Sequence, residues 1–473
     1  MKAEQLTCDY LVVGSGAVGM AFADVLLNET KANIIIVDKY AKPGGHWNLA
    51  YPFVTLHQPS AFYGVCSREL NRGVIDKTGM NKGLMSLASG AEVSAYFDAV
   101  MQETFLPSGR VQYFPLCNYE GDGKFTSITG GKTFEVSVNK KVVDATYLNT
   151  SIPLTHKPSF TRDDKVDFTP VNTLTQHVKK QENYVVLGGG KTGIDTCLWL
   201  LNNFVEPENI HWVVSRDAWL LNRKNTQPLD EFFFDSIGAQ ANQMEAIAQS
   251  SSIDNMFDKL EEKGVMLRID ESVRPSMFHG ATVSEAELAA LKRLPNIIRH
   301  GRVKHVGEHA LEFDSAKWVM PKNTLVIDCS ASAITNLDIK PVFNGNTITP
   351  QTVRAYQPVF SAALIAHVEA AYDDEATKQK LTQVVPLPNR DIDWVPMTAA
   401  MLRNMHIWSE APELREWIRN CRLDGFSKIV HGVEKDDMAK LQVLGRLKGA
   451  SQPAMAKLME FMHMLKASEQ IAS

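Results

Sequence analysis

The feature that most restricts the fold of this chain is a glycine-rich turn that occurs twice, each time between an apolar strand and an apolar helix. Residues 10–13 are apolar, residues 14–19 read Gly-Ser-Gly-Ala-Val-Gly, and residues 20–27 are apolar enough for a buried helix. Residues 184–202 repeat this order, with Gly-Gly-Gly-Lys-Thr-Gly as the turn at 188–193. A strand, a turn of this spacing and a helix begin a dinucleotide-binding βαβ unit, so the chain is expected to contain two.

Each glycine of the first turn has its own physical role. Gly14 permits the tight turn, Gly16 lets the backbone approach a pyrophosphate, and Gly19 allows the helix to pack closely on the strand. The helix that follows offers unpaired N–H groups and the positive end of its dipole to phosphates. The corresponding positions of the second turn are Gly188, Gly190, Lys191, Thr192 and Gly193.

The residues after the second strand of each unit indicate which nucleotide binds. Residues 33–37 form an apolar strand that ends at Asp38, and an acid at this place bonds ribose hydroxyls. The corresponding strand, 210–214, ends in Ser215 and Arg216 without an acid. Because the planar guanidinium matches phosphate oxygens, this ending favours NADPH over NADH.

Three further cations near the second turn each leave two interpretations open. Lys191 either steadies the pyrophosphate or points to solvent. Arg223 and Lys224 either add charge to the phosphate site or are solvated surface cations, and the second interpretation is favoured for Lys224.

A more specific pattern follows Asp38. Lys-Pro-Gly-Gly-His-Trp at 42–47 precedes Tyr-Pro at 51–52 and Leu-His-Gln-Pro-Ser at 56–60. This string resembles the class B flavin-dependent monooxygenases, the flavin-containing and Baeyer-Villiger enzymes, which carry a glycine pair, a variable residue and Trp, then Tyr-Pro. The positions that match are Gly44, Gly45, Trp47, Tyr51 and Pro52.

The resemblance implies that the first unit binds FAD and the second binds NADPH. Besides the first turn, it points to FAD contacts near the ribose-binding acid and at the start of an apolar helix after residue 357. These contacts are Asp38, Lys39, Gly45, His46, Trp47, Ser361 and Ala362.

The candidate catalytic residues are His57 and its neighbour Gln58. The family typically has Asn or Asp where this chain has His57. With an ordinary pKa near 6.5, a histidine there either transfers a proton or holds a substrate, or it merely bonds its own loop.

The implied activity is hydride transfer from NADPH to FAD, followed by reaction with O2 to a flavin C4a-peroxide that passes oxygen to a small-molecule substrate. One departure weakens this implication, because the family's Phe-x-Gly-x-x-x-His motif is missing and residues 160–168 read Phe-Thr-Arg-Asp-Asp-Lys-Val-Asp-Phe. An FAD-dependent NADPH reductase or dehydrogenase without oxygen transfer is therefore the alternative. A nucleotide-binding flavoprotein with a sensor or assembly role is a further one.

The expected fold is α/β, with the NADPH domain inserted in the FAD domain and a helical C-terminal extension. At 473 residues the chain is too long for one ordinary core. Alternation also suggests two short strands, at 133–138 and 141–147, in a small antiparallel layer. The expected boundaries are 1–172 for the first part of the FAD domain, 173–328 for the NADPH domain with a helical insertion at about 227–263, 329–385 for the return to the FAD domain, and 386–473 for the extension.

Charge and composition make several partner classes unexpected. A net charge of −5 gives no strong positive field for nucleic acid, and no stretch approaches the ~20 apolar residues needed for membrane insertion. Six scattered cysteines fit a reducing cytoplasm. His300, His305 and His309 lack a supporting carboxylate, so no metal site is expected. Methionines at residues 455–464 are typical of core packing, with contact in a homo-oligomer as the alternative.

Overall fold

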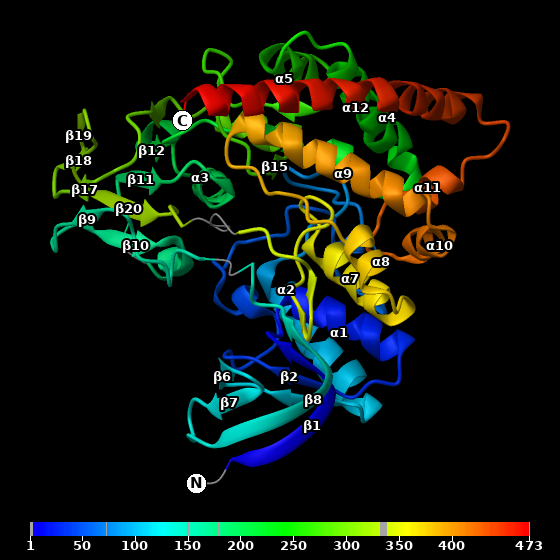
Figure 1. Ribbon diagram of the computed structural model, residues 1–473. Coiled ribbons are helices and arrows are strands. Elements are labelled where there is room, and N and C mark those ends of the chain that lie inside the picture. The colour runs from blue at the N-terminus through cyan, green and yellow to red at the C-terminus, as the bar shows by residue number, and fades with distance from the viewer. Residues whose placement is uncertain (1–2, 72, 149–150, 178–179, 332–337, 473) are drawn as a thin grey trace.

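The computed structural model describes every residue except 1–2, 72, 149–150, 178–179, 332–337 and 473. A mixed sheet with parallel central strands lies near the N-terminus, and a parallel sheet lies toward the other end of the molecule (Figure 1). The C-terminal part of the chain is helical and runs across the end opposite the N-terminus. The expected α/β fold with two sheets and a helical extension is confirmed.

The first sheet has eight strands, with β1 (Glu4–Val13) near its centre. β1 pairs in parallel with β2 (Ile34–Val37) on one side and with β8 (Thr133–Asp144) on the other. The other strands are β5 (Val111–Phe114), β6 (Cys117–Gly121), β7 (Lys124–Ser127), β21 (Phe343–Asn344) and β22 (Thr347–Ile348). Because β22 pairs with β8, the chain returns to this sheet after it has completed the second one.

β8 corrects one expectation from the sequence. The runs at 133–138 and 141–147 are not two separate strands, because one strand spans Thr133–Asp144. The register of its pairing with β1 shifts between Cys8 and Tyr10. Such an irregularity changes the phase of the inward and outward alternation, so one strand has the sequence pattern of two.

The second sheet has five strands in the order β10-β20-β11-β12-β16, all parallel. Its strands are β10 (Phe168–Pro170), β11 (Asn183–Leu187), β12 (Ile210–Val213), β16 (Asn296–Ile298) and β20 (Thr324–Asp328). The short strand β10 belongs to this sheet although the sequence analysis assigned residues up to 172 to the first domain. A three-residue strand has too little periodicity to be found from sequence.

Three small sheets complete the strands. β3 (Gly64–Val65) pairs with β4 (Arg68–Glu69). The other two contain β13 (Leu220–Asn222), β14 (Met266–Leu267) and β15 (Thr282–Val283), and β9 (Thr161–Arg162), β17 (His305–Val306), β18 (Ala310–Glu312) and β19 (Lys317–Val319).

Two helices that are apolar on nearly every side pack on the first sheet. They are α1 (Ala17–Glu29), which follows the first glycine turn, and α7 (Pro358–Ala371), and they lie against each other in one hydrophobic core. A helix without a polar face has to be buried, which explains why these two segments are found between other elements. The other helices of the two nucleotide units are α2 (Gly90–Val100), α3 (Lys191–Asn202) and α6 (Glu285–Leu291).

The expected helical insertion packs on the C-terminal extension. α4 (Phe233–Ala248) lies along α12 (Met438–Ala472), and both contribute to a hydrophobic core (Figure 1). The remaining helices are α5 (Ile253–Glu262), α8 (Glu375–Leu381), α9 (Trp394–Ser409), α10 (Pro412–Asn420) and α11 (Ser427–His431). Within α12, Met459 and Met464 are 44% and 53% exposed, so they lie outside this core.

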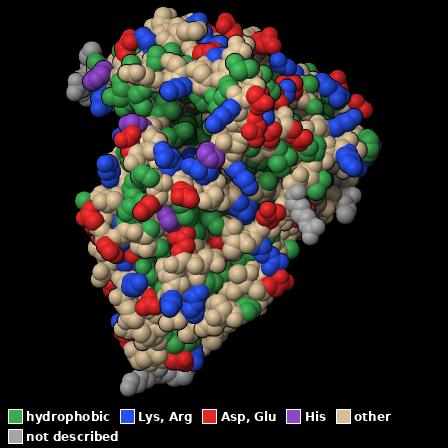
Figure 2. Space-filling model, turned by 90° about the vertical axis from the view of Figure 1, so that its right-hand side faces the viewer, with side chains coloured by type: hydrophobic (Ala, Val, Ile, Leu, Met, Phe, Trp, Pro, Cys, Tyr) green, Lys and Arg blue, Asp and Glu red, His purple; other side chains and the backbone are tan. Residues whose placement is uncertain are grey.

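Two surface properties follow from the coordinates. In the part of the chain that the structure describes, no helix combines the length and the apolar composition that crossing a membrane requires. Acidic and basic side chains are interspersed on the face shown in Figure 2.

Candidate active site

The two glycine turns have the same internal geometry. In each, a methyl group added to the third glycine would lie 1.9 Å from the carbonyl oxygen of the first, which holds for Gly19 and Gly14 and for Gly193 and Gly188. The first glycines have φ of +101° and +128°, a region that favours glycine. The chain therefore builds the same close crossing of strand and helix at two places.

The helices that follow these turns begin without a capping side chain. α1 has Gly16 and α3 has Gly190 at the N-cap, and neither glycine can accept a hydrogen bond through a side chain. α2 and α6, by contrast, begin with complete capping boxes. The first N–H groups of α1 and α3 are thus left for another acceptor, and this arrangement fits a phosphate.

Asp38 lies beside the first turn, as its position after β2 predicts. Its Oδ2 accepts hydrogen bonds from the backbone N–H of Ser15 at 2.5 Å and from the Ser15 hydroxyl at 2.7 Å, and its Oδ1 accepts one from the Tyr40 N–H at 2.8 Å. Each carboxylate oxygen has more than one acceptor site, so Asp38 can still receive a ribose hydroxyl. Lys39 next to it is exposed, with its ammonium 5.3 Å from the centre of the Tyr40 ring.

The loop at 44–47 lies against the same turn. A methyl group on Gly45 would be 3.0 Å from the Cα atom of Gly16, and the φ of Gly45 is +60°, so this close approach favours glycine. His46 stacks on Trp47 with ring centres 5.3 Å apart, and the Trp47 indole donates to the Tyr63 hydroxyl at 2.9 Å. Burial lowers the pKa of His46 to about 4, so this ring is neutral at physiological pH.

Ser361 and Ala362 are each 1% exposed in the first turns of α7. The Ser361 hydroxyl donates to the carbonyl of Gln357 at 2.8 Å and accepts from the N–H of Val353 at 3.2 Å. This side chain therefore holds the loop that leads into α7. A contact of either residue with a flavin stays a prediction.

In the second unit a cationic side chain, Arg216, follows the end of β12, as the sequence indicates. Ser215 is exposed, and Arg216 donates through Nη2 to Asn389 Oδ1 at 2.8 Å. Asp217 follows directly, but both of its oxygens accept hydrogen bonds from Arg299, at 2.9 and 3.0 Å. The carboxylate nearest to Arg216 in sequence is thus already neutralised by another cation.

The two units meet where the loop that follows β2, which contains Tyr51, contacts the start of α3. The Tyr51 hydroxyl donates to Asp195 Oδ2 at 2.6 Å, and Asp195 forms an ion pair with Lys191 one helical turn earlier. Burial, followed by the negative charge of Asp195, raises the pKa of Tyr51 well above its ordinary value. Lys191 therefore does not point to solvent, because its side chain is 9% exposed and pairs with the acid on its own helix, and its contact with a pyrophosphate stays a prediction.

His57 lies at this junction. Burial, then the positive charges of Lys191 and Arg223, lower the pKa of His57, while Asp195 opposes the effect. The side chain is exposed, so water still reaches part of the ring. The lowered pKa makes His57 more fully neutral at physiological pH than the ordinary value assumed from the sequence would.

Gln58 is turned toward its own loop. Its amide nitrogen lies 3.5 Å from the carbonyl oxygen of Phe62, at the limit of a hydrogen bond. A direct role for Gln58 in catalysis stays a prediction.

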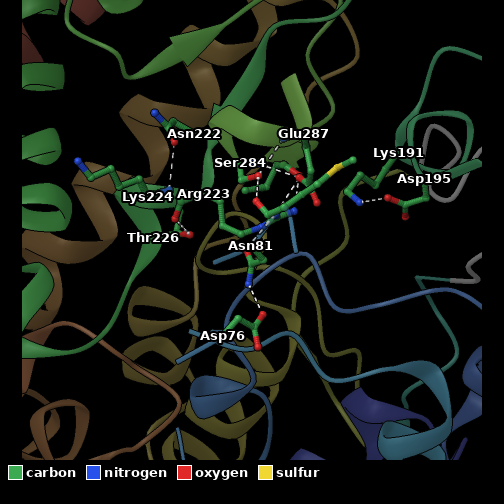
Figure 3. A network of polar contacts seen from close by, with 12 residues as sticks. Asp76, Asn81, Lys191, Asp195, Asn222, Arg223, Lys224, Thr226, Ser284 and Glu287 are labelled. Carbon is green, nitrogen blue, oxygen red and sulfur yellow. Dashed lines mark hydrogen bonds and ion pairs between the residues drawn. The ribbon is translucent and has the colours of Figure 1, made fainter. Parts of the chain in front are cut away.

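Arg223 lies at the centre of a buried polar network (Figure 3). It is fully buried and donates to Glu287 at 2.7 Å, to Asn81 at 3.3 Å and to the carbonyl of Thr282 at 3.0 Å. It is therefore neither a surface cation nor open to a phosphate, and both expectations for it are wrong. By contrast, the side chain of Lys224 is 49% exposed and pairs with an acid on α4.

Most partners in these contacts were not predictable from the sequence. The pairing of Lys191 with Asp195 does have a local signal, the spacing of one turn on a helix. Tyr51 contacts a residue 144 positions away and Arg216 contacts one 173 positions away, and such pairs leave no trace in periodicity. Among the described residues, no group of His, Cys, Asp or Glu is arranged to hold a metal ion. His305 instead contacts Thr161 and Asp163.

Two sheets with parallel central strands, each followed by the same glycine turn and helix, define the chain as a protein with two dinucleotide-binding units. It belongs to the same family as two mycobacterial proteins. Uncharacterized protein Rv2000 of Mycobacterium tuberculosis (strain ATCC 25618 / H37Rv) is 42% identical over 464 residues, which cover 97% of this chain and 86% of that protein. Uncharacterized protein Mb2023 of Mycobacterium bovis matches with the same identity and coverage. No family model matches the chain.

The solved structures that the chain resembles include monooxygenases, in line with the resemblance seen in the sequence. An open crystal structure of cyclohexanone monooxygenase is 13% identical to this chain. The match covers 77% of this chain and 87% of the monooxygenase chain, with a TM-score of 0.48. The polycyclic ketone monooxygenase of Thermothelomyces thermophila is 12% identical, covers 96% and 89%, and has a TM-score of 0.45.

Proposed function

We propose that this protein is an FAD- and NADPH-dependent oxidoreductase that acts as a monooxygenase on a small molecule. The observation that carries the proposal is the pair of glycine turns. In each, a methyl group on the third glycine would lie 1.9 Å from the carbonyl oxygen of the first, and each turn leads into a helix without a capping side chain. Two such units in contact suit a reaction between two bound dinucleotides.

The residues present fit the two groups. Gly14, Gly16 and Gly19 would hold the FAD pyrophosphate and Asp38 its ribose, because these residues leave room and acceptors beside the helix N-terminus. The turn of the second unit and Arg216 would hold NADPH in the same way. When bound, FAD supplies an acceptor for a hydride from NADPH and a donor of electrons to O2.

The chain's own contribution to the reaction is alignment. The hydrogen bond from Tyr51 to Asp195 joins the loop that follows β2 to the N-terminal part of α3. The two nucleotide sites therefore keep one relative position. Fixing two reactants in this way removes much of the entropic cost of their encounter. His57 at the junction is neutral, so one of its ring nitrogens can accept a hydrogen bond and the other can donate one, without a positive charge on the ring.

One observation favours a reductase without oxygen transfer as the second candidate. The segment in which related monooxygenases carry Phe-x-Gly-x-x-x-His forms β9 and β10 here, and both strands belong to sheets of the second unit. This segment contains neither the glycine nor the histidine of that motif, and it serves as strands instead.

Anaerobic mixing of the purified protein with NADPH or NADH tests the proposal. We expect NADPH to bleach the flavin absorbance and NADH to do so at much higher concentration, because Arg216 favours the 2′-phosphate. Failure of NADPH to bleach the flavin would refute the proposal. In air, H2O2 formed in a one-to-one ratio with NADPH consumed, for all amines, sulfides and ketones tried, would select the reductase.

A further inference from the structure

The environment of Arg216 contains a second group that no local sequence pattern marks. Three segments meet there: the residues after β12, residues 276–279 and residues 389–391. The backbone joins them directly, because the Trp219 N–H donates to the Met277 carbonyl at 2.9 Å and the Asp391 N–H donates to the Ser276 carbonyl at 3.2 Å. His279 is thereby fixed between the end of β12 and the segment that carries Asn389.

The contacts of Asn389 determine which nitrogen of the neutral His279 ring carries the proton. Its Oδ1 lies 2.8 Å from Arg216 Nη2 and 3.0 Å from His279 Nε2. Arginine has only donors, so the Asn389 atom that it contacts must be the amide oxygen. An oxygen without a hydrogen can only accept, and His279 Nε2 therefore carries a proton. In the neutral ring Nδ1 is then unprotonated and is the one position where His279 can take up a proton.

Arg216 and His279 are close enough to contact one phosphate. Because both bond the same oxygen, their nitrogens are no more than 5.8 Å apart, the sum of the two contacts. His279 is exposed and Arg216 is partly exposed, so a ligand can reach both. Phosphate oxygens accept several hydrogen bonds at once and suit such a convergent pair of donors.

We propose that His279 is a second residue of the NADPH 2′-phosphate site and that NADPH binding favours protonation of His279 at Nδ1. This inference rests on the proposed function, since it assigns a further residue to the same nucleotide site. It makes the preference for NADPH over NADH dependent on pH, with stronger preference at lower pH.

The charges around His279 support the direction of this effect. Without nucleotide, partial desolvation by the neighbouring segments and the positive charge of Arg216 lower the pKa of His279, while its bond to Asn389 opposes them, so the ring is neutral near pH 7. The other charged groups carried by these segments are Asp217, paired with Arg299, and Arg390, Asp391 and Asp393, of which Arg390 and Asp393 form an ion pair. A 2′-phosphate adds a charge of about −1.5 to −2 and reverses the local potential, which favours the protonated ring.

Calorimetric titration of the FAD-loaded protein with NADP+ and with NAD+ tests the inference, in two buffers of different ionisation enthalpy at pH 7. For the wild type we expect uptake of part of a proton with NADP+ and none with NAD+. His279→Gln is the matched variant, because its amide can still donate to Asn389 but cannot take up a proton. We expect this variant to bind NADP+ severalfold more weakly than the wild type and NAD+ equally well.

The 2′-phosphate itself titrates near pH 6, so only the pH dependence that is lost in His279→Gln belongs to the histidine. Equal NADP+ affinity and equal proton uptake in wild type and variant would overturn the inference and leave the proposed function standing. A wild type that does not prefer NADP+ to NAD+ would overturn both.

Discussion

The second glycine turn allows folding and binding to be tested with one pair of substitutions. In Gly193→Ala the new methyl group would lie 1.9 Å from the Gly188 carbonyl oxygen, about 1 Å closer than real contacts allow. α3 has to move away from β11, and overpacking of this kind costs about 1–3 kcal/mol. Gly190→Ala is the matched control, because its φ is −83° and a methyl group there has no neighbour within 4 Å.

We expect Gly193→Ala to lower the Tm of the second unit by about 2–12 °C, from about 2–4 °C for each kcal/mol in a unit of this size. Gly190→Ala should melt about 1–4 °C below the wild type, because alanine is worse than glycine at an N-cap by about 0.5–1 kcal/mol. Its methyl group would nevertheless stand where a pyrophosphate approaches, so the affinity for NADPH should fall about tenfold or more.

Differential scanning fluorimetry of the FAD-loaded protein measures both Tm values, and stopped-flow flavin reduction at a series of NADPH concentrations measures the affinity. The reasoning about packing fails if Gly193→Ala has the same Tm as the wild type. The reasoning about the nucleotide fails if Gly190→Ala binds NADPH as tightly as the wild type does.

Two further predictions concern charges outside the turns. Glu287→Gln keeps the cap of α6 but leaves the buried guanidinium of Arg223 without a counter-ion, so urea denaturation should show a loss of about 3–5 kcal/mol; unchanged stability would contradict this. Hydrogen bonding to Arg446, aided by Lys263, lowers the pKa of Glu245 to about 2. A lowered folded pKa stabilises the protein above the unfolded value near 4.3, and this contribution is lost as the pH falls toward 2. Acid should therefore loosen α12 from α4, as hydrogen exchange can measure, and Glu245→Gln should remove this part of the pH dependence.

The parts of the fold that were predictable from sequence depend on neighbouring residues. Both strand, turn and helix units, the strands that end at Asp38 and before Arg216, and the helical insertion follow from periodicity and from glycine spacing over fewer than 40 residues each. The apolar α7 was recognisable for the same reason. A local pattern is sufficient here because strand and helix formation are decided mainly by nearby residues.

The parts that were not predictable depend on pairing across the chain. The three residues of β10 join a strand that begins more than 150 positions later, and the phase shift in β8 arises from its pairing with β1. Neither effect leaves a period in the sequence, so a boundary was set too late and one strand was expected as two.

The same division holds for the candidate site. By itself, the sequence determined that two dinucleotide-binding turns exist and that the second is followed by a cation, because each motif places its chemistry within one βαβ unit. Only the tertiary structure decided that Tyr51 bonds Asp195, that Arg223 is buried beside Glu287, and that His279 shares Asn389 with Arg216. These contacts set the protonation states of the groups, because burial and the charges of partners distant in sequence shift a pKa, and packing alone brings those partners together.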